Sequence, residues 1–351
     1  MKKSIVYIVL IFFVAVYFIS SDLELNKLFR TYRYKPNSLI GTDIGRYGDL
    51  YDGTYLPDYK HFSFMNGGLN CALINKPYNS VPKNINLYVI HDSYLEYLSD
   101  SMLYGVDKLV NCSSDNVIKL DKSKDNILLI ETVERYLRRD FVDSTITFDK
   151  LKIGEQVASS GPSGLSRFFS SMLKPSSKPE LEFNLFGYKL FTPLKEFKAQ
   201  MNYKLFGRVN KGVSISSDKK YLFYTETTDT LLKTSSFNPI KDIEVAQIVT
   251  TLNAISSHYK KLGFDKVYFS IMPNPVSILN TEKRTYNQLI PRIQFSEDLK
   301  MQIIDIYTKF LQTKRQVYYN SDTHWNVTGF QLWLDEFNKE LKRHKISTVK
   351  S

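Results

Sequence analysis

The amino-acid sequence predicts an α/β protein built on a doubly wound parallel sheet. Short, continuously apolar runs that are typical of buried strands alternate with amphipathic stretches that are typical of helices, and they do so along most of the chain. At 351 residues, with 43% hydrophobic and 14% aromatic residues, the chain is globular and has ample material for a core. In such sheets ligands bind beyond the carboxyl ends of the strands, so candidate site residues are sought there.

The first half of the predicted domain covers residues 61–145. Its short apolar runs predict three strands, at 85–90, 107–112 and 126–131. The stretch after the first strand predicts a helix that ends at Gly105 and whose apolar face carries Leu95, Leu98 and Met102. The stretch TVERYLRRDF predicts a second helix, on whose surface Glu134 and Arg135 are expected to be solvated.

The second half covers residues 196–345. A helix that ends at Gly263 is predicted by the apolar stripe of Val245, Ile248, Val249, Leu252, Ile255 and Tyr259. The elements expected after it are a strand at 266–272, a helix over SEDLKMQIIDIYTKFL, a strand at 316–319 and a final helix carrying Phe330, Leu334, Phe337 and Leu341. Residues 146–195 are rich in Ser, Pro and Gly, and we interpret them as an insertion that joins the two halves.

The N-terminal residues indicate the compartment. Lys2 and Lys3 precede an uncharged apolar run over residues 5–19, which is the pattern of a secretory signal or of a short membrane anchor. Both interpretations stay open, but no A-x-A cleavage site follows, which favours an uncleaved signal anchor over residues 1–20. With the lysines inside, the rest of the chain is expected outside the cytoplasm. Residues 21–60, polar and aromatic with turn signals, are expected to be an extended segment.

The net charge of +11 favours anionic partners, such as a membrane surface or an acidic polymer. The chain has no Arg-rich arm, zinc-finger spacing or RNA-binding aromatic motif, so nucleic acid is not an expected partner. Its two cysteines, Cys71 and Cys112, match no metal motif and are expected either to pair outside the cytoplasm or to be separate buried thiols. No cofactor is expected.

An aspartate and a histidine follow the predicted strand at 316–319, in the stretch YYNSDTHWNVTG. A catalytic histidine needs a carboxylate that fixes its tautomer and a nucleophile on its other ring nitrogen. His324 could be that histidine and Asp322 that carboxylate, so a nucleophile remains to be found. The alternative is that Asp322 or Ser321 caps a helix while His324 is partly exposed. None of the five histidines has a partner at metal-ligand spacing, so no metal is expected.

The candidate nucleophile is Ser93, which follows the predicted strand at 85–90 in the stretch INLYVIHDSYLEYL. A serine at that junction is presented at the carboxyl edge of the sheet, where the N-terminal amides of the next turn can stabilise an oxyanion. The alternative is that Ser93 only caps a helix. Because both halves of a triad fall at carboxyl ends of strands in one predicted sheet, we prefer the catalytic interpretation of Ser93, Asp322 and His324.

Several stretches resemble the SGNH hydrolase superfamily, and more closely its alginate O-acetylation branch. HDSY resembles the serine block of SGNH esterases, and SDTHWN resembles the D-x-H-W block of that branch. Further blocks of the branch are resembled by NYKLFGRVNKGVSISSDKKYLFY, IMPNPVSIL and NILLIETVERYL, so that the resemblance covers about residues 60–145 and 196–345. It implies a three-layer sandwich of SGNH or flavodoxin-like type that carries a Ser-His-Asp triad.

The chain departs from this branch in two ways. There the D-x-H-W block precedes the serine block, so this chain looks circularly permuted, which a triad tolerates because it depends on geometry and not on chain order. His91 stands where the family has glycine, and it either crowds or assists Ser93 or is simply a packed histidine. Asn274 is a candidate oxyanion donor or a turn residue, and Tyr94 could line a sugar site or pack in the core.

The resemblance implies an extracytoplasmic O-acetyltransferase, or an acetylesterase, that modifies a cell-surface polysaccharide, with a membrane acyltransferase as the source of acetyl groups. Both activities share an acyl-enzyme and differ only in whether sugar or water resolves it, so the sequence does not separate them. The second hypothesis is a catalytically inactive relative that binds the polysaccharide or scaffolds an export complex. The sequence names neither the glycan nor the acetyl donor nor the oligomeric state.

Overall fold

The computed structural model describes residues 2–21, 41–43, 45–61, 78, 81–112, 117–142, 152–153, 187–279, 281 and 284–349. The chain divides into two compact units. One comprises Met1–Arg46, Tyr55–Asp58 and Val157–Val209, and the other comprises Tyr47–Thr54, Tyr59–Gln156 and Asn210–Ser351. The second unit carries the candidate site.

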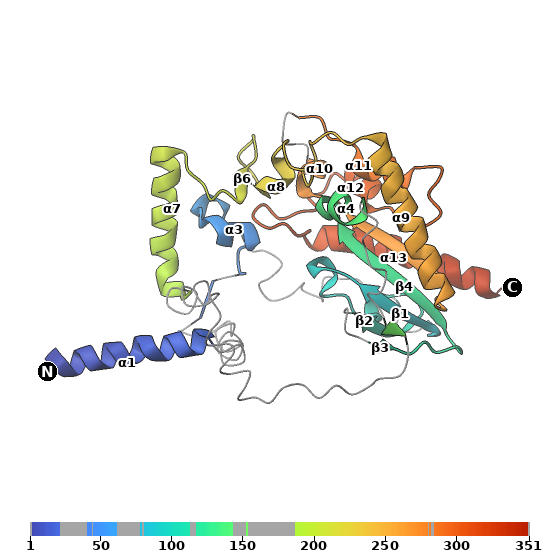
Figure 1. Cartoon of the computed structure of the whole chain (residues 1–351), viewed down its shortest axis with the longest axis horizontal. Coiled ribbons are helices and arrows are strands. Elements are labelled where there is room, and N and C mark those ends of the chain that lie inside the picture. The colour runs from blue at the N-terminus through green and yellow to red at the C-terminus, as the bar shows by residue number, and fades with distance from the viewer. Residues whose placement is uncertain are drawn as a thin grey trace. The chain divides into compact units, whose positions relative to one another are not determined.

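Helices are the regular elements of the first unit within its described residues. It contains α1 (Lys2–Ser21), the 3₁₀ turn η5 (Lys189–Phe191) and α7 (Thr192–Phe206), which Gly207 ends in a left-handed conformation at φ 60° (Figure 1). Within the described ranges no helix has both the length and the apolar character needed to cross a membrane. The anchor predicted for residues 1–20 stays a prediction.

The second unit is built on a sheet of five parallel strands (Figure 1). They are β1 (Ile85–Ile90), β2 (Val106–Asn111), β4 (Asp125–Val133), β8 (Lys266–Met272) and β9 (Gln302–Ile304). Their order in the sheet is β2-β1-β4-β8-β9. The direction in which the chain adds strands therefore reverses between β1 and β4, as it does in doubly wound sheets. This confirms the predicted parallel α/β architecture.

Both faces of the central strands β1, β4 and β8 are buried, which is why these strands are largely apolar, whereas the edge strand β2 is only partly buried. Successive side chains of a strand point to opposite faces. In β1, Leu87 and Val89 enter one hydrophobic core, whereas Tyr88 between them enters the other. The same alternation holds in β4, where Leu129 joins the first core and Leu128 the second.

Helices cover the two faces and complete three layers. The first core is closed by side chains of α12 (Ile306–Gln312) and α13 (Val327–Val349). The second core is closed by α4 (Glu134–Phe141), α9 (Asp242–Lys261) and α11 (Leu289–Gln294). The predicted apolar stripes of α9 and α13 are confirmed as their buried faces.

The chain also contains short elements. In chain order they are α3 (Asp49–Thr54), η1 (Pro57–Tyr59), η3 (Ser93–Leu95), η4 (Asp100–Met102), β3 (Val117–Ile118), β5 (Lys152–Ile153), β6 (Val213–Ile215), β7 (Leu222–Tyr224), α8 (Thr225–Thr228) and α10 (Pro275–Leu279). β3 pairs with β5, and β6 pairs with β7 as an antiparallel hairpin. Most of the insertion predicted at 146–195 lies outside the described residues, as does Cys71, on which the predicted disulfide depends.

Four of the predicted elements are wrong. The segment 21–60, expected to be extended, contains α3 and η1 in its described part, because its turn residues close short helical turns. The helix expected after β1 is instead the two 3₁₀ turns η3 and η4, although its apolar residues are buried as expected. The strand expected at 316–319 makes only one isolated bridge, between Tyr318 and Trp325. The fifth strand is β9, inside a stretch that was expected to be helical, because a strand of three residues is too short to show a periodicity of its own.

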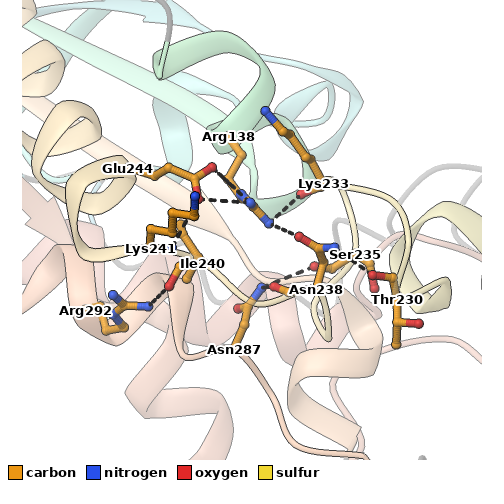
Figure 2. A network of polar contacts seen from close by, with 10 residues as sticks. All are labelled: Arg138, Thr230, Lys233, Ser235, Asn238, Ile240, Lys241, Glu244, Asn287 and Arg292. Atoms are coloured by element: carbon orange, nitrogen blue, oxygen red, sulfur yellow. Dashed lines mark hydrogen bonds and ion pairs between the residues drawn. The ribbon is translucent and has the colours of Figure 1, made fainter.

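A network of charged and amide groups fixes α4, the helix that follows β4 (Figure 2). The Arg138 guanidinium donates to both carboxylate oxygens of Glu244 on α9, at 2.9 and 3.2 Å. It also donates to Asn238 Oδ1 at 2.6 Å, and Asn287 donates in turn to the Asn238 carbonyl at 2.9 Å. Because bidentate, charge-assisted bonds of this kind are among the strongest, they hold α4 and the loop before α9 as one body.

Candidate active site

Ser93 lies at the carboxyl edge of the sheet, three residues after the end of β1. The side chain of Asp92 accepts the backbone N–H of Tyr94 at 2.9 Å, which turns the chain into η3 and leaves Ser93 exposed at its start. The neighbouring strand supports the same turn, because Glu131 Oε2 on β4 accepts the backbone N–H of Asp92 at 2.8 Å. The serine thus stands beside the β1–β4 reversal, where ligands of doubly wound sheets bind.

Asp322 and His324 lie on a loop that is anchored in the core. Trp325, which follows directly, is fully buried and packs at a ring-centroid distance of 5.9 Å from Trp333 of α13. Gly329 lets the backbone pass closely here, since a Cβ on it would lie 2.5 Å from the carbonyl oxygen of Val317. The packing leaves Asp322 only 1% exposed and His324 6% exposed, so the side chains of both residues are held in place by the core around the loop.

The three predicted triad residues meet in one chain of hydrogen bonds. The Nδ1–H of His324 donates to Asp322 Oδ1 at 2.7 Å, and its Nε2 accepts the hydroxyl of Ser93 at 2.7 Å. The backbone N–H of His324 donates to the same Asp322 oxygen at 3.0 Å, closing the loop around the carboxylate. These are the separations that a nucleophile, a base and an orienting acid require.

Tyr94 connects the serine turn to the histidine loop. Its hydroxyl donates to the carbonyl oxygen of Thr323, and its ring lies 4.8 Å from the imidazole of His324 between centroids. It is 1% exposed, and burial raises its pKa well above the ordinary tyrosine value. Of the two predicted alternatives for Tyr94, sugar contact and core packing, the structure shows the packing.

A segment that the sequence did not single out supports the histidine loop from the other side. The backbone N–H groups of Leu50 and Tyr51, at the start of α3, both donate to the carbonyl oxygen of Ser321, at 3.2 and 3.1 Å. Asp49 accepts the N–H and the hydroxyl of Thr323, at 2.9 and 2.5 Å. In the sequence, the local sign of this contact is limited to the acidic residue Asp49 directly after Gly48, in a stretch rich in turn-forming residues.

Nearby charges tune the titration of the imidazole. Burial by itself lowers the pKa of His324, but the hydrogen bond and charge of Asp322, together with the charges of Asp49 and Asp92, outweigh burial and raise the pKa above the ordinary histidine value. Burial and then the charge of Asp322 raise the pKa of Asp49 to about 6. The surroundings of His324 therefore stabilise its imidazolium form more than water does, which suits a base that becomes protonated during the reaction.

Among the residues that the structure describes, Asp49, Asp322 and His324 also form a group that could hold a metal ion. Their ligand atoms all lie within 4.8 Å of one another. The His324 Nδ1 and an oxygen of Asp322 are already bonded to each other, and both oxygens of Asp49 accept from Thr323. A metal would have to replace these bonds. The donor set fits an orienting hydrogen-bond network better than a preformed ligand cage.

The two other predicted site residues lie in different surroundings. The Nδ1–H of His91 donates to the carbonyl oxygen of Asp92, so this half-buried imidazole packs along the serine turn. Asn274 is fully buried; its amide donates to Ser236 Oγ at 3.0 Å, and its backbone N–H donates to Glu134 at 2.8 Å. Its side chain therefore belongs to a buried network at the carboxyl end of β8.

The prediction that Glu134 and Arg135 are solvated is wrong. Glu134 is 2% exposed and accepts the hydroxyl of Ser277 at 2.7 Å, whereas Arg135 is 8% exposed. The Arg135 guanidinium lies over the rings of Tyr136 and Tyr224 and 3.4 Å from a carboxylate oxygen of Glu226. Both residues lie in the first turn of α4, where α10 contacts Glu134 while β7 and α8 contact Arg135. Contacts between distant segments leave no periodic signal in the sequence.

Comparison of the chain with protein-family models, with curated proteins and with solved structures yields no match to any of them.

Proposed function

We propose that this chain is a serine acyl-transfer enzyme, an O-acetyltransferase or acetylesterase that acts on an extracytoplasmic polysaccharide. The observation that carries the proposal is the unbroken series of bonds from Ser93 Oγ through His324 to Asp322, with both links at 2.7 Å. The exposure of Ser93 supports the same function, because the nucleophile is open to solvent while His324 and Asp322 are buried.

The chemistry follows from these positions. Ser93 Oγ attacks the carbonyl carbon of an acetyl ester while His324 Nε2 takes the hydroxyl proton, and Asp322 stabilises the resulting imidazolium. The C–O bond to the leaving alcohol breaks as His324 returns the proton to that alcohol, leaving an acetyl-serine. In the second half, His324 takes a proton from a sugar hydroxyl or from water, whose oxygen attacks the acetyl carbon. The bond from that carbon to Ser93 Oγ then breaks as His324 gives the proton back to Ser93.

The oxyanion of each tetrahedral intermediate needs hydrogen-bond donors near Ser93. The backbone N–H of Ser93 is suited to this, because it begins the turn η3 and donates to no group within the described part of the chain. A donor of this kind is fixed before the reaction starts. We assign it as one oxyanion donor, in place of the side chain of Asn274, which the buried network occupies.

The substrate class rests on sequence. The SDTHWN stretch resembles the alginate O-acetylation branch, whose members imply an acetylated glycan and a membrane acyltransferase that supplies acetyl groups. The net charge of +11 suits an acidic polysaccharide. The lysines and apolar run within residues 1–20 support a place outside the cytoplasm and at the membrane.

The second candidate function is a polysaccharide-binding or export-scaffold protein without catalysis. One observation favours it: His91 occupies the position of the family glycine, and its ring lies against the serine turn through its bond to the Asp92 carbonyl. A bulky side chain there narrows the space that an ester could use beside Ser93. A protein that only binds polysaccharide would not need the hydrogen bonds that connect Ser93, His324 and Asp322.

Hydrolysis of p-nitrophenyl acetate by the full chain tests the proposal. Ser93→Ala and His324→Ala are compared with Ser101→Ala, a matched control that removes a serine hydroxyl from η4, where it contacts Ser99 at 3.0 Å. We expect turnover in the wild type and the control and a loss of about 10³-fold or more in both triad variants. Oligosaccharide acceptors then separate transfer from hydrolysis. Equal background rates in all four proteins would leave the binding function, which polysaccharide affinity then tests.

A further inference from the structure

Asp49 contacts the residue that lies between the two buried members of the triad. Both of its carboxylate oxygens are used: Oδ1 accepts the backbone N–H of Thr323 at 2.9 Å, and Oδ2 accepts the Thr323 hydroxyl at 2.5 Å. Thr323 separates Asp322 from His324 in the chain. A carboxylate bonded twice to this residue restrains the backbone from which both catalytic side chains project.

The segment that carries Asp49 is itself locked to the loop. The hydroxyl of Ser321 donates to the carbonyl oxygen of Tyr47 at 2.6 Å, and the first N–H groups of α3 bind the Ser321 carbonyl. Gly48 allows this approach, because its φ of +102° suits glycine and a Cβ would lie 2.2 Å from the Ser321 carbonyl oxygen. Asp49 is therefore held in place before any substrate arrives.

The charge of Asp49 also acts on the triad. Four titratable groups face it: Asp322 and His324 on the catalytic loop, Tyr94 on η3 and Tyr224 on β7. The tyrosines are neutral at ordinary pH, since burial raises the pKa of both. The groups that respond near neutrality are thus Asp49 and His324, whose opposite charges attract, while Asp322 repels Asp49.

We propose that Asp49 is a positioning residue of the active site, whose carboxylate holds the Asp322–His324 loop through Thr323 and whose negative charge stabilises the His324 imidazolium during acyl transfer. This inference rests on the proposed function for its catalytic meaning. The contacts with Thr323 and the electrostatic effect on His324 are testable without turnover.

Substitutions separate the two parts of this role. Asp49→Asn keeps an oxygen for the Thr323 N–H but removes the charge, whereas Asp49→Ala removes both. Thr323→Val removes the hydroxyl and Thr323→Ser restores one. The matched control is Asp305→Asn, because Asp305 also accepts a threonine N–H at 2.9 Å, that of Thr308, as the cap of α12. Asparagine caps helices as well as aspartate does, so the control changes charge without changing geometry.

The first measurement is the NMR titration of the His324 imidazole in the full chain, with His324→Gln to assign the resonance. Loss of the Asp49 charge should lower the pKa of His324 in Asp49→Asn, because a neighbouring negative charge stabilises the protonated ring. Asp305→Asn should titrate as the wild type does. An unchanged His324 titration in a folded Asp49→Asn protein would overturn the electrostatic part of the proposal, whether or not the protein turns over an ester.

The second measurement is the pH profile of kcat/KM for p-nitrophenyl acetate. We expect Asp49→Ala to lose about 100-fold, the order that a small misplacement of catalytic groups costs, and Asp49→Asn to lose less while its acid limb moves to lower pH. Thr323→Ser should recover most of what Thr323→Val loses. Wild-type rates in folded Asp49→Ala would overturn the positioning role, whereas inactivity of the wild type itself would instead count against the proposed function.

Discussion

The carbonyl oxygen of Ser321 lies 2.2 Å from the point at which a Cβ on residue 48 would stand, so Gly48 is the residue that lets α3 reach the catalytic loop. The φ of +102° at Gly48 is itself a conformation that other residues rarely adopt. The two restrictions act together on any other residue at position 48. Its Cβ would clash if the backbone kept this angle, and a backbone that moved aside would lose its contacts with the Ser321 carbonyl.

Gly48→Ala should therefore destabilise the protein by at least about 2 kcal/mol and reduce ester turnover further than the loss of folded protein explains. The control is Gly53→Ala in the same helix, where a Cβ would make only a 3.4 Å contact with Val213. This control should change stability by less than about 1 kcal/mol. Thermal unfolding and turnover of both variants check the prediction; equal stability of the two would contradict the assigned role of Gly48.

Tyr94→Phe removes the hydroxyl that bonds to the Thr323 carbonyl and leaves that buried oxygen without its partner. We expect a cost of about 1–3 kcal/mol in the free energy of unfolding, together with slower turnover, because the His324 ring loses a fixed neighbour. Tyr88→Phe is the matched control: it deletes a hydroxyl bonded to the Lys119 carbonyl at 3.4 Å, in the second core. If turnover falls equally in both variants, Tyr94 has no specific role at the site.

The sequence predicted the parts of this structure that depend on local pattern. β1 and β8 have the bounds predicted from their largely apolar runs, because both faces of a central parallel strand are buried. The same pattern indicates Ser93, which follows the run of β1 at the carboxyl edge of the sheet, whereas residues 316–319 before Asp322 and His324 make only one isolated bridge. The structure brings these three side chains into hydrogen-bond contact.

The missed features depend on contacts between distant segments. Asp49 and Thr323 are 274 residues apart, and no periodicity relates them. The turns η3 and η4 replace a helix because Asp92 and Asp100 bond to backbone N–H groups just ahead of them, which competes with helical hydrogen bonds. Glu134 and Arg135 looked solvated because a charged residue gives no sign of the tertiary cover that buries it.

Chelation offers a test of the alternative in which Asp49, Asp322 and His324 hold a metal. Turnover of p-nitrophenyl acetate should be unchanged after prolonged treatment with EDTA, because His324 Nδ1 is bonded to Asp322 and both oxygens of Asp49 accept from Thr323. A sample dialysed without chelator is the control. Loss of turnover that added Zn²⁺ restores would replace the serine mechanism with a metal-assisted one.

Glu131 should make the protein less stable as pH rises. It is 5% exposed, and burial, followed by the charge of Asp92, raises its pKa well above the ordinary carboxyl value. The folded state therefore keeps a proton that the unfolded state releases, so the contribution of Glu131 to stability is full below the unfolded pKa of about 4.3 and declines as pH rises toward the folded pKa.

Glu131→Gln should remove this part of the pH dependence, because the amide resembles the neutral acid and can still accept the Asp92 N–H that Glu131 accepts at 2.8 Å. Its melting temperature should exceed that of the wild type by a margin that grows from about pH 5 to about pH 8. Glu297→Gln, which removes an exposed carboxylate, should show no such divergence. Parallel curves for the wild type and Glu131→Gln would mean that Glu131 is ionised in the folded protein, and that the turn under Ser93 rests on a buried charge.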